Sequence, residues 1–248
     1  MRPQFSIITC TRNSLATLQE TLRSVQDQRG VSVEQVFVDG NSTDGTLDLL
    51  RAQTGEVTIL EGVEGGISRA MNIGIKAARG EVIAHLHSDD YYLHERVLEV
   101  VWQRMQASSC DWLFGRIQLD VEGQLHTENF RAPRYCRKAL LRGNFVPHPA
   151  TFVRRDVFKQ LGVFREDYRY AMDYEFWLRI SGRTIVCQLD DALAAFRVHG
   201  GSASTANKGA AIAEDLRARL HYMPLWGWPL AGLRFLVRRQ RVFAAAKR

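Results

Sequence analysis

The feature that most constrains this fold is an alternation of short β-rich runs and helical patterns that occurs four times within residues 5–105. In the first unit, apolar residues from Leu15 to Val25 recur at helical spacing behind Ser14, a common helix-capping residue type. The strands are predicted at residues 5–9, 36–38, 57–60 and 82–86, and the helices at residues 14–28, 46–52, 68–78 and 93–105. Four such units predict an α/β fold, with a mostly parallel sheet between two layers of helices.

The pattern becomes less regular after Cys110. The predicted elements there are a hairpin of residues 112–119 and 124–130, a strand at 151–153, a helix at 173–180 and a helix beyond Thr205. No stretch rich in Pro, Gly or Ser divides the chain, so both halves are expected to share one sheet. We therefore predict one domain over residues 1–204, with halves at 1–108 and 109–204, and a basic helical tail over 205–248.

The net charge of +6 is concentrated at one end of the chain. Residues 217–248 contain eight Lys or Arg residues and no Asp or Glu, which leaves 25 basic and 27 acidic residues elsewhere. That balance argues against a nucleic-acid partner. The four cysteines fit neither a Cys-x-x-Cys metal site nor a disulfide framework, which indicates a reducing compartment. Since the first residues carry no signal-peptide pattern, we expect a cytoplasmic protein.

The tail also carries an apolar run of eleven residues, 223–233, where spanning a bilayer takes about 20. Trp226 and Trp228 suit the headgroup level of a membrane, and the arginines from Arg234 onward suit anionic lipid. The tail is therefore predicted to hold the protein peripherally on the inner face of an anionic membrane. In the alternative, the apolar face packs on the domain or on a second copy of the chain, giving a homodimer.

Polar clusters at residues 9–13, 39–45 and 87–90 follow three of the predicted strands. In parallel sheets, ligands bind outside the carboxyl ends of the strands, so the site is expected there. A carboxylate such as Asp39 can accept hydrogen bonds from a base or ribose. The alternative for this loop is a simple turn that is capped by Asp44 or Ser42.

Asp89 and Asp90 are adjacent carboxylates at the end of a predicted strand. They repel each other unless a cation or hydrogen-bond donors share the site. Hard oxygen ligands suit Mg²⁺ or Mn²⁺ carrying a diphosphate, so a divalent ion is implied. The alternative is a pair of solvated loop acids before the next helix.

Taken together in chain order, these features resemble the family 2 glycosyltransferases, which are inverting enzymes of the GT-A fold that use nucleotide-diphosphate sugars. The resemblance covers residues 5–204. It rests on Ser6-Ile7-Ile8-Thr9-Cys10-Thr11-Arg12-Asn13, on Val38-Asp39-Gly40 with Ser42 and Asp44-Gly45-Thr46, on Gly66-Ile67 with Ala70-Met71-Asn72 and Gly74-Ile75, and on Ser88-Asp89-Asp90. It implies a GT-A domain whose half at 1–108 binds the nucleotide-sugar and whose half at 109–204 binds the acceptor.

The resemblance also implies roles for single residues. Thr9, Thr11 and Asp39 are expected to hold the nucleoside. Asp89 resembles the ribose-side carboxylate, and Asp90 resembles the metal-binding one of the family's Asp-x-Asp-type motif.

Two positions differ from the residues that are usual in the family, and a third lies in a segment that resembles it. His87 stands where relatives often carry a small polar residue such as Asn, and Arg69 stands where many have an acid. His199 lies in a late segment in which a histidine can approach the metal or the diphosphate, so it is the candidate second ligand; the alternative is a surface histidine. The glycines beside it would let this loop close over the donor.

Displacement with inversion needs a base that removes the proton of the acceptor hydroxyl. The segment around Ala171-Met172-Asp173 is similar to acceptor-side segments of bacterial members, and Asp173 is the candidate base. Glu175 is the second candidate. The alternative role for Asp173 is the cap of the following helix.

The function predicted from these residues is a glycosyltransferase that depends on Mn²⁺ or Mg²⁺. It would move a sugar from a nucleotide-diphosphate sugar, a UDP-sugar or else a GDP- or dTDP-sugar, to a surface or lipid-linked glycan. One alternative is a sugar nucleotidyltransferase, although the first loop lacks the glycines that such enzymes carry. The other is a non-catalytic, membrane-associated scaffold that binds nucleotide-sugars.

Overall fold

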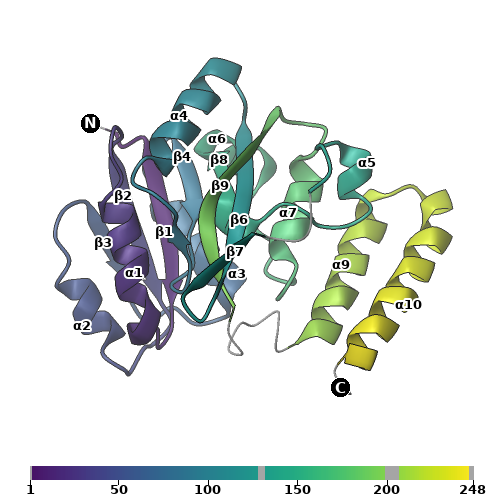
Figure 1. Cartoon of the computed structure of the whole chain (residues 1–248), viewed down its shortest axis with the longest axis horizontal. Helices are drawn as coiled ribbons and strands as arrows, with labels where there is room; N and C mark the ends of the chain where they lie inside the picture. The colour runs from purple at the N-terminus through teal and green to yellow at the C-terminus, as the bar shows by residue number, and fades with distance from the viewer. Residues whose placement is uncertain (1, 128–131, 199–206, 246–248) are drawn as a thin grey trace.

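The computed structural model describes residues 2–127, 132–198 and 207–245, and their strands form one curled, mostly parallel sheet (Figure 1). The strand order is β3-β2-β1-β4-β8-β6-β9-β5, and β7 pairs with β6. The strands are β1 (Phe5–Thr11), β2 (Val33–Asp39), β3 (Val57–Leu60), β4 (Val82–His85), β5 (Tyr91–Tyr92), β6 (Trp112–Val121), β7 (Gln124–Thr127), β8 (Thr151–Arg154) and β9 (Val186–Arg197). Only β5, β7 and β8 run against their neighbours among the described strands. The predicted α/β fold is confirmed.

Helices cover both faces of the sheet. One layer contains α1 (Leu15–Gln26), α2 (Thr46–Arg51) and α4 (Val97–Ser108), and the other contains α3 (Ile67–Ala77), α6 (Arg155–Leu161) and α7 (Met172–Ile180). In β1, Phe5 and Ile7 pack toward α4, whereas Ile8 packs toward α3. Successive strand side chains point to opposite faces, so a strand that is buried on both faces is apolar throughout.

The sequence pattern does not predict β9, the long strand that pairs along β6. Asp190 and Asp191 interrupt its apolar residues, and both are exposed. They lie where the pairing with β6 shifts register, around Arg116. Gly115 permits this irregularity, because a Cβ atom there would lie 2.4 Å from Cδ1 of Leu193. The predicted second strand of the hairpin is present as β7 over Gln124–Thr127, and its predicted residues 128–130 lie outside the described ranges.

The helix α4 begins four residues later than predicted. Tyr91 and Tyr92 form the short strand β5 against β9, and the backbone N–H of Leu93 donates to the carbonyl of Leu193 at 3.1 Å. Those bonds keep the chain extended up to the start of the helix at Val97.

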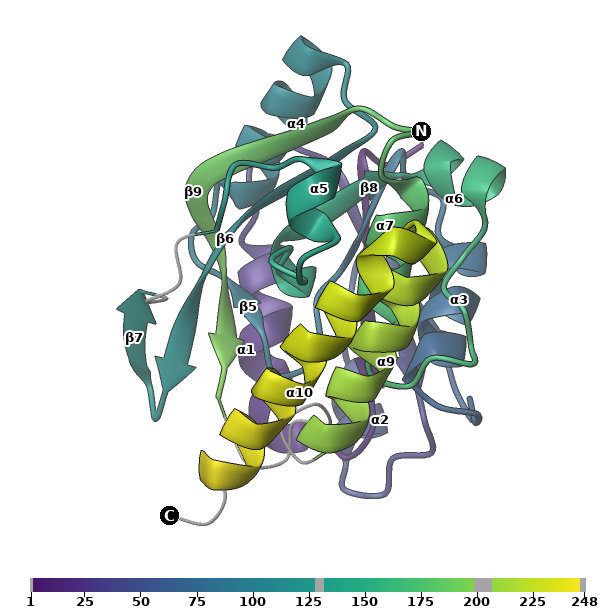
Figure 2. The same ribbon diagram turned by 90° about the vertical axis from the view of Figure 1, so that its right-hand side faces the viewer.

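Two long helices follow the sheet. Helix α9 (Lys208–Tyr222) packs along α7, and α10 (Trp228–Ala245) packs along the outer side of α9, as Figure 2 shows. Between them lies the short 3₁₀ helix η2 (Leu225–Gly227). Within the described parts of the chain, no helix combines the length and the apolar character that crossing a membrane requires.

A buried ion pair within α7 also accepts a hydrogen bond from α9. Glu175 is 0% exposed, and its carboxylate binds Arg179 at 2.9 Å and accepts the hydroxyl proton of Tyr222. The Arg179 guanidinium also donates to the carbonyls of Leu161 and Val163. Removing one partner of such a pair leaves a buried charge without compensation.

We expect Glu175→Gln to lower the free energy of unfolding by about 3 kcal/mol, because Arg179 would keep its buried charge. Urea denaturation measures the change. The matched control is Glu61→Gln, which breaks the exposed pair with Arg51 and should change the free energy of unfolding by less than about 1 kcal/mol. Equal effects of the two substitutions would contradict a stabilising role for the buried pair.

Candidate functional site

The strands β1, β2 and β4 end side by side, and we call the edge of the sheet where they end the carboxyl edge. The parallel register pairs Thr11 with Asp39 and Ile8 with His85. The loop after β4 joins the loop after β1 through a hydrogen bond of 2.8 Å from the Ser88 hydroxyl to that of Ser14. The three polar clusters of the sequence therefore meet at this edge.

Asp39 is fully buried at the carboxyl edge. Its carboxylate accepts the hydroxyl proton of Thr11 at 2.8 Å and both the backbone N–H and the hydroxyl of Ser42, at 2.8 and 2.5 Å. A carboxylate offers about four acceptor positions, so these three hydrogen bonds leave one unused. Thr9 lies two residues before Thr11 on the same face of β1 and is 1% exposed.

Asp44 organises the same loop. One carboxylate oxygen accepts the backbone N–H of Thr46 at 3.0 Å, where α2 begins, and the other accepts that of Leu15 at 3.1 Å, where α1 begins. The hydroxyl of Thr46 also donates a hydrogen bond to Asp44, and this bond is the main cause that lowers the pKa of Asp44. The two backbone hydrogen bonds lower this pKa further. Asp44 thus holds two helix starts in place, while Asp39 joins the two loops beneath them.

Asp90 is the most isolated carboxylate of the edge. It is 0% exposed, Oδ1 accepts the backbone N–H of Arg197 at 3.2 Å, and Oδ2 has no hydrogen-bond partner among the described residues. Burial first, and then the charge of neighbouring Asp89, raise the pKa of Asp90 well above its ordinary value. Asp89 itself is half-buried.

An enclosed carboxylate oxygen with no partner suits a cation. The described residues contain no group of three or more side chains that could hold a metal ion together. His199, the candidate second ligand, lies outside the described residues. The donor set at Asp90 fits a divalent cation carried in with a diphosphate.

Arg197 is a site residue that our sequence analysis assigned no role. Its backbone N–H binds Asp90, and its guanidinium pairs with Glu20 and with Asp120 and lies 5.6 Å from the centre of the Tyr91 ring. These side chains line a recess of about 370 Å³ beside Asp90. The sequence does offer a sign of this role, because Arg197 lies two residues before the candidate metal ligand His199.

Asp173 lies in the first turn of α7 and is half-buried. Its carboxylate accepts the backbone N–H of Tyr174 at 2.6 Å and, at 3.4 Å, the side-chain amide of Asn144. Burial, with a contribution from the charge of Asp215, raises the pKa of Asp173 to about 7. A group with that pKa is suited to accept a proton near neutral pH.

The sequence leaves two alternatives at this helix, Asp173 as the cap of the helix and Glu175 as the base. The residue that precedes α7 is Ala171, and the backbone N–H groups of residues 169–171 donate to Glu214 of α9, so Asp173 is not the helix cap. The carboxylate of Glu175 is already engaged by Arg179 and Tyr222.

A short segment connects Asp173 to the carboxyl edge. Asn144 contacts Asp173, and four residues later the ring of His148 stacks on that of His87, with 5.2 Å between ring centroids. Four residues of extended chain span at most about 14 Å. This segment therefore links Asp173 to the loop after β4, which carries the candidate donor-binding acids Asp89 and Asp90.

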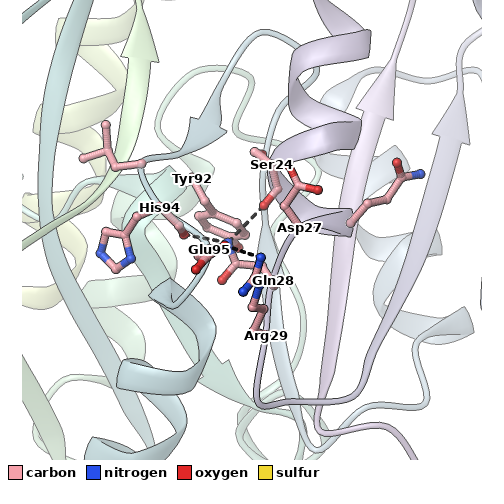
Figure 3. Close-up of a pocket in the computed structure, with 9 residues that line it drawn as sticks. Ser24, Asp27, Gln28, Arg29, Tyr92, His94 and Glu95 are labelled. Atoms are coloured by element: carbon pink, nitrogen blue, oxygen red, sulfur yellow. Dashed lines mark hydrogen bonds and ion pairs between the residues drawn. The ribbon is translucent and has the colours of Figure 1, made fainter.

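A second recess, larger than the one beside Asp90, lies elsewhere (Figure 3). It has a volume of about 640 Å³, lies between the end of α1 and the loop after β5, and contains none of the predicted site residues. Arg29 and Glu95 pair within it at 2.9 Å, and the Gln28 amide donates to the carbonyl of His94. Helix α1 has 12 residues, so this recess is separated by about 18 Å of helix from the loop after β1.

Comparisons with known proteins identify relatives of this chain. The profile described as Glycosyl transferase family 2 matches residues 6–162. The chain is 31% identical, over 76% of its length and 75% of the relative's, to an uncharacterized glycosyltransferase of Mycobacterium tuberculosis. It is 30% identical, over 82% of its length and 80% of the relative's, to a PGL/p-HBAD biosynthesis glycosyltransferase of Mycobacterium bovis. An uncharacterized protein of M. tuberculosis is 27% identical over 75% of this chain and only 64% of its own length.

Solved structures share the fold. S. aureus TarS in complex with UDP-GlcNAc superposes with a TM-score of 0.73 at 22% identity, covering 94% of this chain and 71% of TarS. A mannosyltransferase from Pyrobaculum calidifontis in complex with GDP-Man and Mn²⁺ superposes with a TM-score of 0.68 at 18% identity, covering 100% of this chain and 81% of the other. The fold of this chain is the GT-A fold of glycosyltransferases.

Proposed function

Because the chain belongs to glycosyl transferase family 2, we propose that it moves a sugar from a nucleotide-diphosphate sugar to a glycan or lipid-linked saccharide, with inversion at the anomeric carbon. The observation that carries this proposal is the link of Asp173, with a pKa of about 7, through Asn144 and the stacked rings of His148 and His87 to the carboxyl edge. The UDP-GlcNAc in TarS supports a UDP-sugar as donor, and the GDP-Man of the mannosyltransferase leaves a GDP-sugar as the alternative.

In this proposal the carboxyl edge binds the donor. Thr9, Thr11 and Asp39 hold the nucleoside, and the remaining acceptor position of Asp39 takes a hydrogen bond from it. Asp89 binds on the ribose side. Asn13 and Ser42 tie the loops after β1 and β2 together by hydrogen bonds, next to the strand ends that carry Thr11 and Asp39.

Asp90 and His199 are the residues that would hold Mn²⁺ or Mg²⁺. The partnerless Oδ2 of Asp90 supports this role for Asp90. When bound, such an ion would neutralise the negative charge that develops on the departing diphosphate. The Mn²⁺ in the mannosyltransferase structure supports the same choice of metal.

Asp173 acts as the base in this proposal. Its carboxylate accepts the proton of the acceptor hydroxyl while that oxygen forms a bond to the anomeric carbon, and the bond from this carbon to the diphosphate breaks. Asn144 keeps the carboxylate oriented. A purely scaffolding protein would have no use for a buried carboxylate with a free oxygen at Asp90, because such a group destabilises the fold.

We expect the chain, incubated with Mn²⁺ and a panel of UDP- and GDP-sugars, to release the nucleoside diphosphate from at least one of them. Asp90→Asn keeps the shape but removes the charge that holds the ion, so the release rate should fall by about 10²-fold or more. The matched control is Asp48→Asn, an exposed position on α2, which should leave the rate unchanged. An unchanged rate in excess EDTA would contradict metal dependence.

We expect the rate of transfer to rise with pH and to level off above about pH 7, because the raised pKa keeps Asp173 protonated in more acidic solution. Asp173→Asn should lower turnover by about 10² to 10⁴-fold, with nearly normal donor affinity, and should abolish this dependence. Asp215→Asn removes the neighbouring charge and should move the midpoint to lower pH. If the transfer rate of Asp173→Asn still rises with pH with the midpoint of the wild type, Asp173 is not the base.

We also propose that α10 attaches the enzyme to the inner face of an anionic membrane. Ala231 is buried against α9, and Arg238 pairs with Asp215 of α9 at 2.6 Å. The opposite side of α10 presents an exposed apolar face, and the turn before the helix is exposed as well. The exposed apolar residues are Leu225 (74%), Trp226 (84%), Trp228, Leu230, Leu233, Leu236 and Val237.

Charge complementarity favours lipid as the occupant of this face. Arg234 and Arg239 are exposed beside it, and residues 217–248 contain no acidic residue. An amphipathic helix with arginines beside its apolar face binds in the interface of anionic bilayers. A lipid-linked acceptor would be reached from that position.

We expect the full chain to float with liposomes of anionic lipid and to be released by high salt. Leu233→Glu places a charge in the apolar face and should prevent flotation, whereas Leu125→Glu, at an exposed position of β7, should not. If neither the wild type nor the variant floats, and only the variant sediments as a monomer, the face is a contact between two copies of the chain instead.

A further inference from the structure

Three histidines gather where the carboxyl edge meets α7. They are His85 at the end of β4, His87 two residues later, and His148 from the loop before β8. The ring of His148 lies 5.2 Å from that of His87, nearly parallel at 18°, and 5.5 Å from that of His85. Stacked rings do not direct their nitrogens at a common point, and the described residues show no metal-binding group here.

The cluster is held uncharged by its surroundings. Burial lowers the pKa of all three rings, that of His85 to about 3. His148 packs near Phe164 and Trp177, and neither of its nitrogens has a partner among the described residues. A neutral imidazole donates one hydrogen bond and accepts another, which matches a hydroxyl group better than a phosphate.

His87 is the member of the cluster that a ligand can reach. It is half-buried, and among the described residues neither of its nitrogens forms a hydrogen bond, although they are not enclosed as those of His148 are. His148 covers one side of its ring.

The reaction requires a sugar near this ring. If the proposed function holds, on which this inference rests, the transferred sugar lies between the diphosphate near Asp90 and the base at Asp173. His87 precedes Asp89 by two residues, and His148 is joined to Asp173 through Asn144.

We infer that His87 forms a hydrogen bond with a hydroxyl group of the transferred sugar, and that His148 is a positioning residue that holds the His87 ring by stacking. The pair is thus a recognition element for the donor sugar, separate from the nucleoside contacts at Asp39.

Calorimetric titration of the full chain with Mn²⁺ tests this inference. The probes are UDP, GDP, UDP-GlcNAc, UDP-glucose, UDP-galactose and GDP-mannose, and the measured quantity is the ratio of the affinity for a sugar-bearing probe to that for its own nucleotide. In His87→Phe, which keeps a ring but removes both nitrogens, this ratio should fall about 3- to 10-fold while the affinity for the nucleotide changes less than about 2-fold. His126→Ala, at an exposed position of β7, is the control that should not change the ratio.

His148→Ala should lower the same ratio, because the His87 ring loses its support, and His148→Phe should restore it. Thermal unfolding of each variant reports whether the fold survives. Equal losses for nucleotide and nucleotide-sugar, or no loss in His87→Phe, would overturn the inference and leave the proposed function intact. Failure of the wild type to bind any probe would overturn both.

Discussion

The parallel pairing of β1 with β2 and β4 is the constraint on which the rest of this structure depends. Its register sets Thr11 beside Asp39 and Ile8 beside His85, so the loops that follow these strands meet at one edge. A shift by one residue would turn every side chain of a strand to the other face. The side-chain hydrogen bonds of Ser6 with Glu34 and of Thr11 with Asp39, which join residues paired in register on β1 and β2, oppose that shift and hold the site in place.

The buried carboxylates of the site are of two kinds. Asp39 is surrounded by donors and shapes the loops, whereas Asp90 and Asp173 are incompletely paired and have raised pKa values. The ordinary pKa of an aspartate is about 3.9, and that of Asp173 in the folded chain is about 7. Between these values the folded state binds more protons, so the ionisation of Asp173 lowers the free energy of unfolding as the pH rises. A carboxylate whose ionisation lowers the free energy of unfolding near neutral pH is suited to accept a proton there.

The first half of the fold could be predicted because neighbouring residues determine each strand-helix unit. The spacing of the apolar residues indicates each strand and helix, and polar residues mark the ends of the strands. β9 could not be predicted from the sequence. Asp190 and Asp191 interrupt its apolar pattern where the register shifts, and its pairing with β6 joins residues that are far apart in the chain. Family motifs named Asp39, Asp89, Asp90 and Asp173, but not the surroundings that set their pKa values. The stacking of His87 on His148 was invisible for the same reason, since 61 residues separate the two rings.

The last two helices connect the membrane proposal to the chemistry. Asp215 of α9 contributes to the raised pKa of Asp173, and Arg238 of α10 pairs with Asp215 at 2.6 Å. Arg238 therefore lies on the side of α10 that packs on α9. The exposed apolar face is on the opposite side of α10. The charge beside the candidate base therefore depends on how α10 packs on α9, and a lipid surface that holds α10 against α9 would preserve the environment that raises the pKa of Asp173.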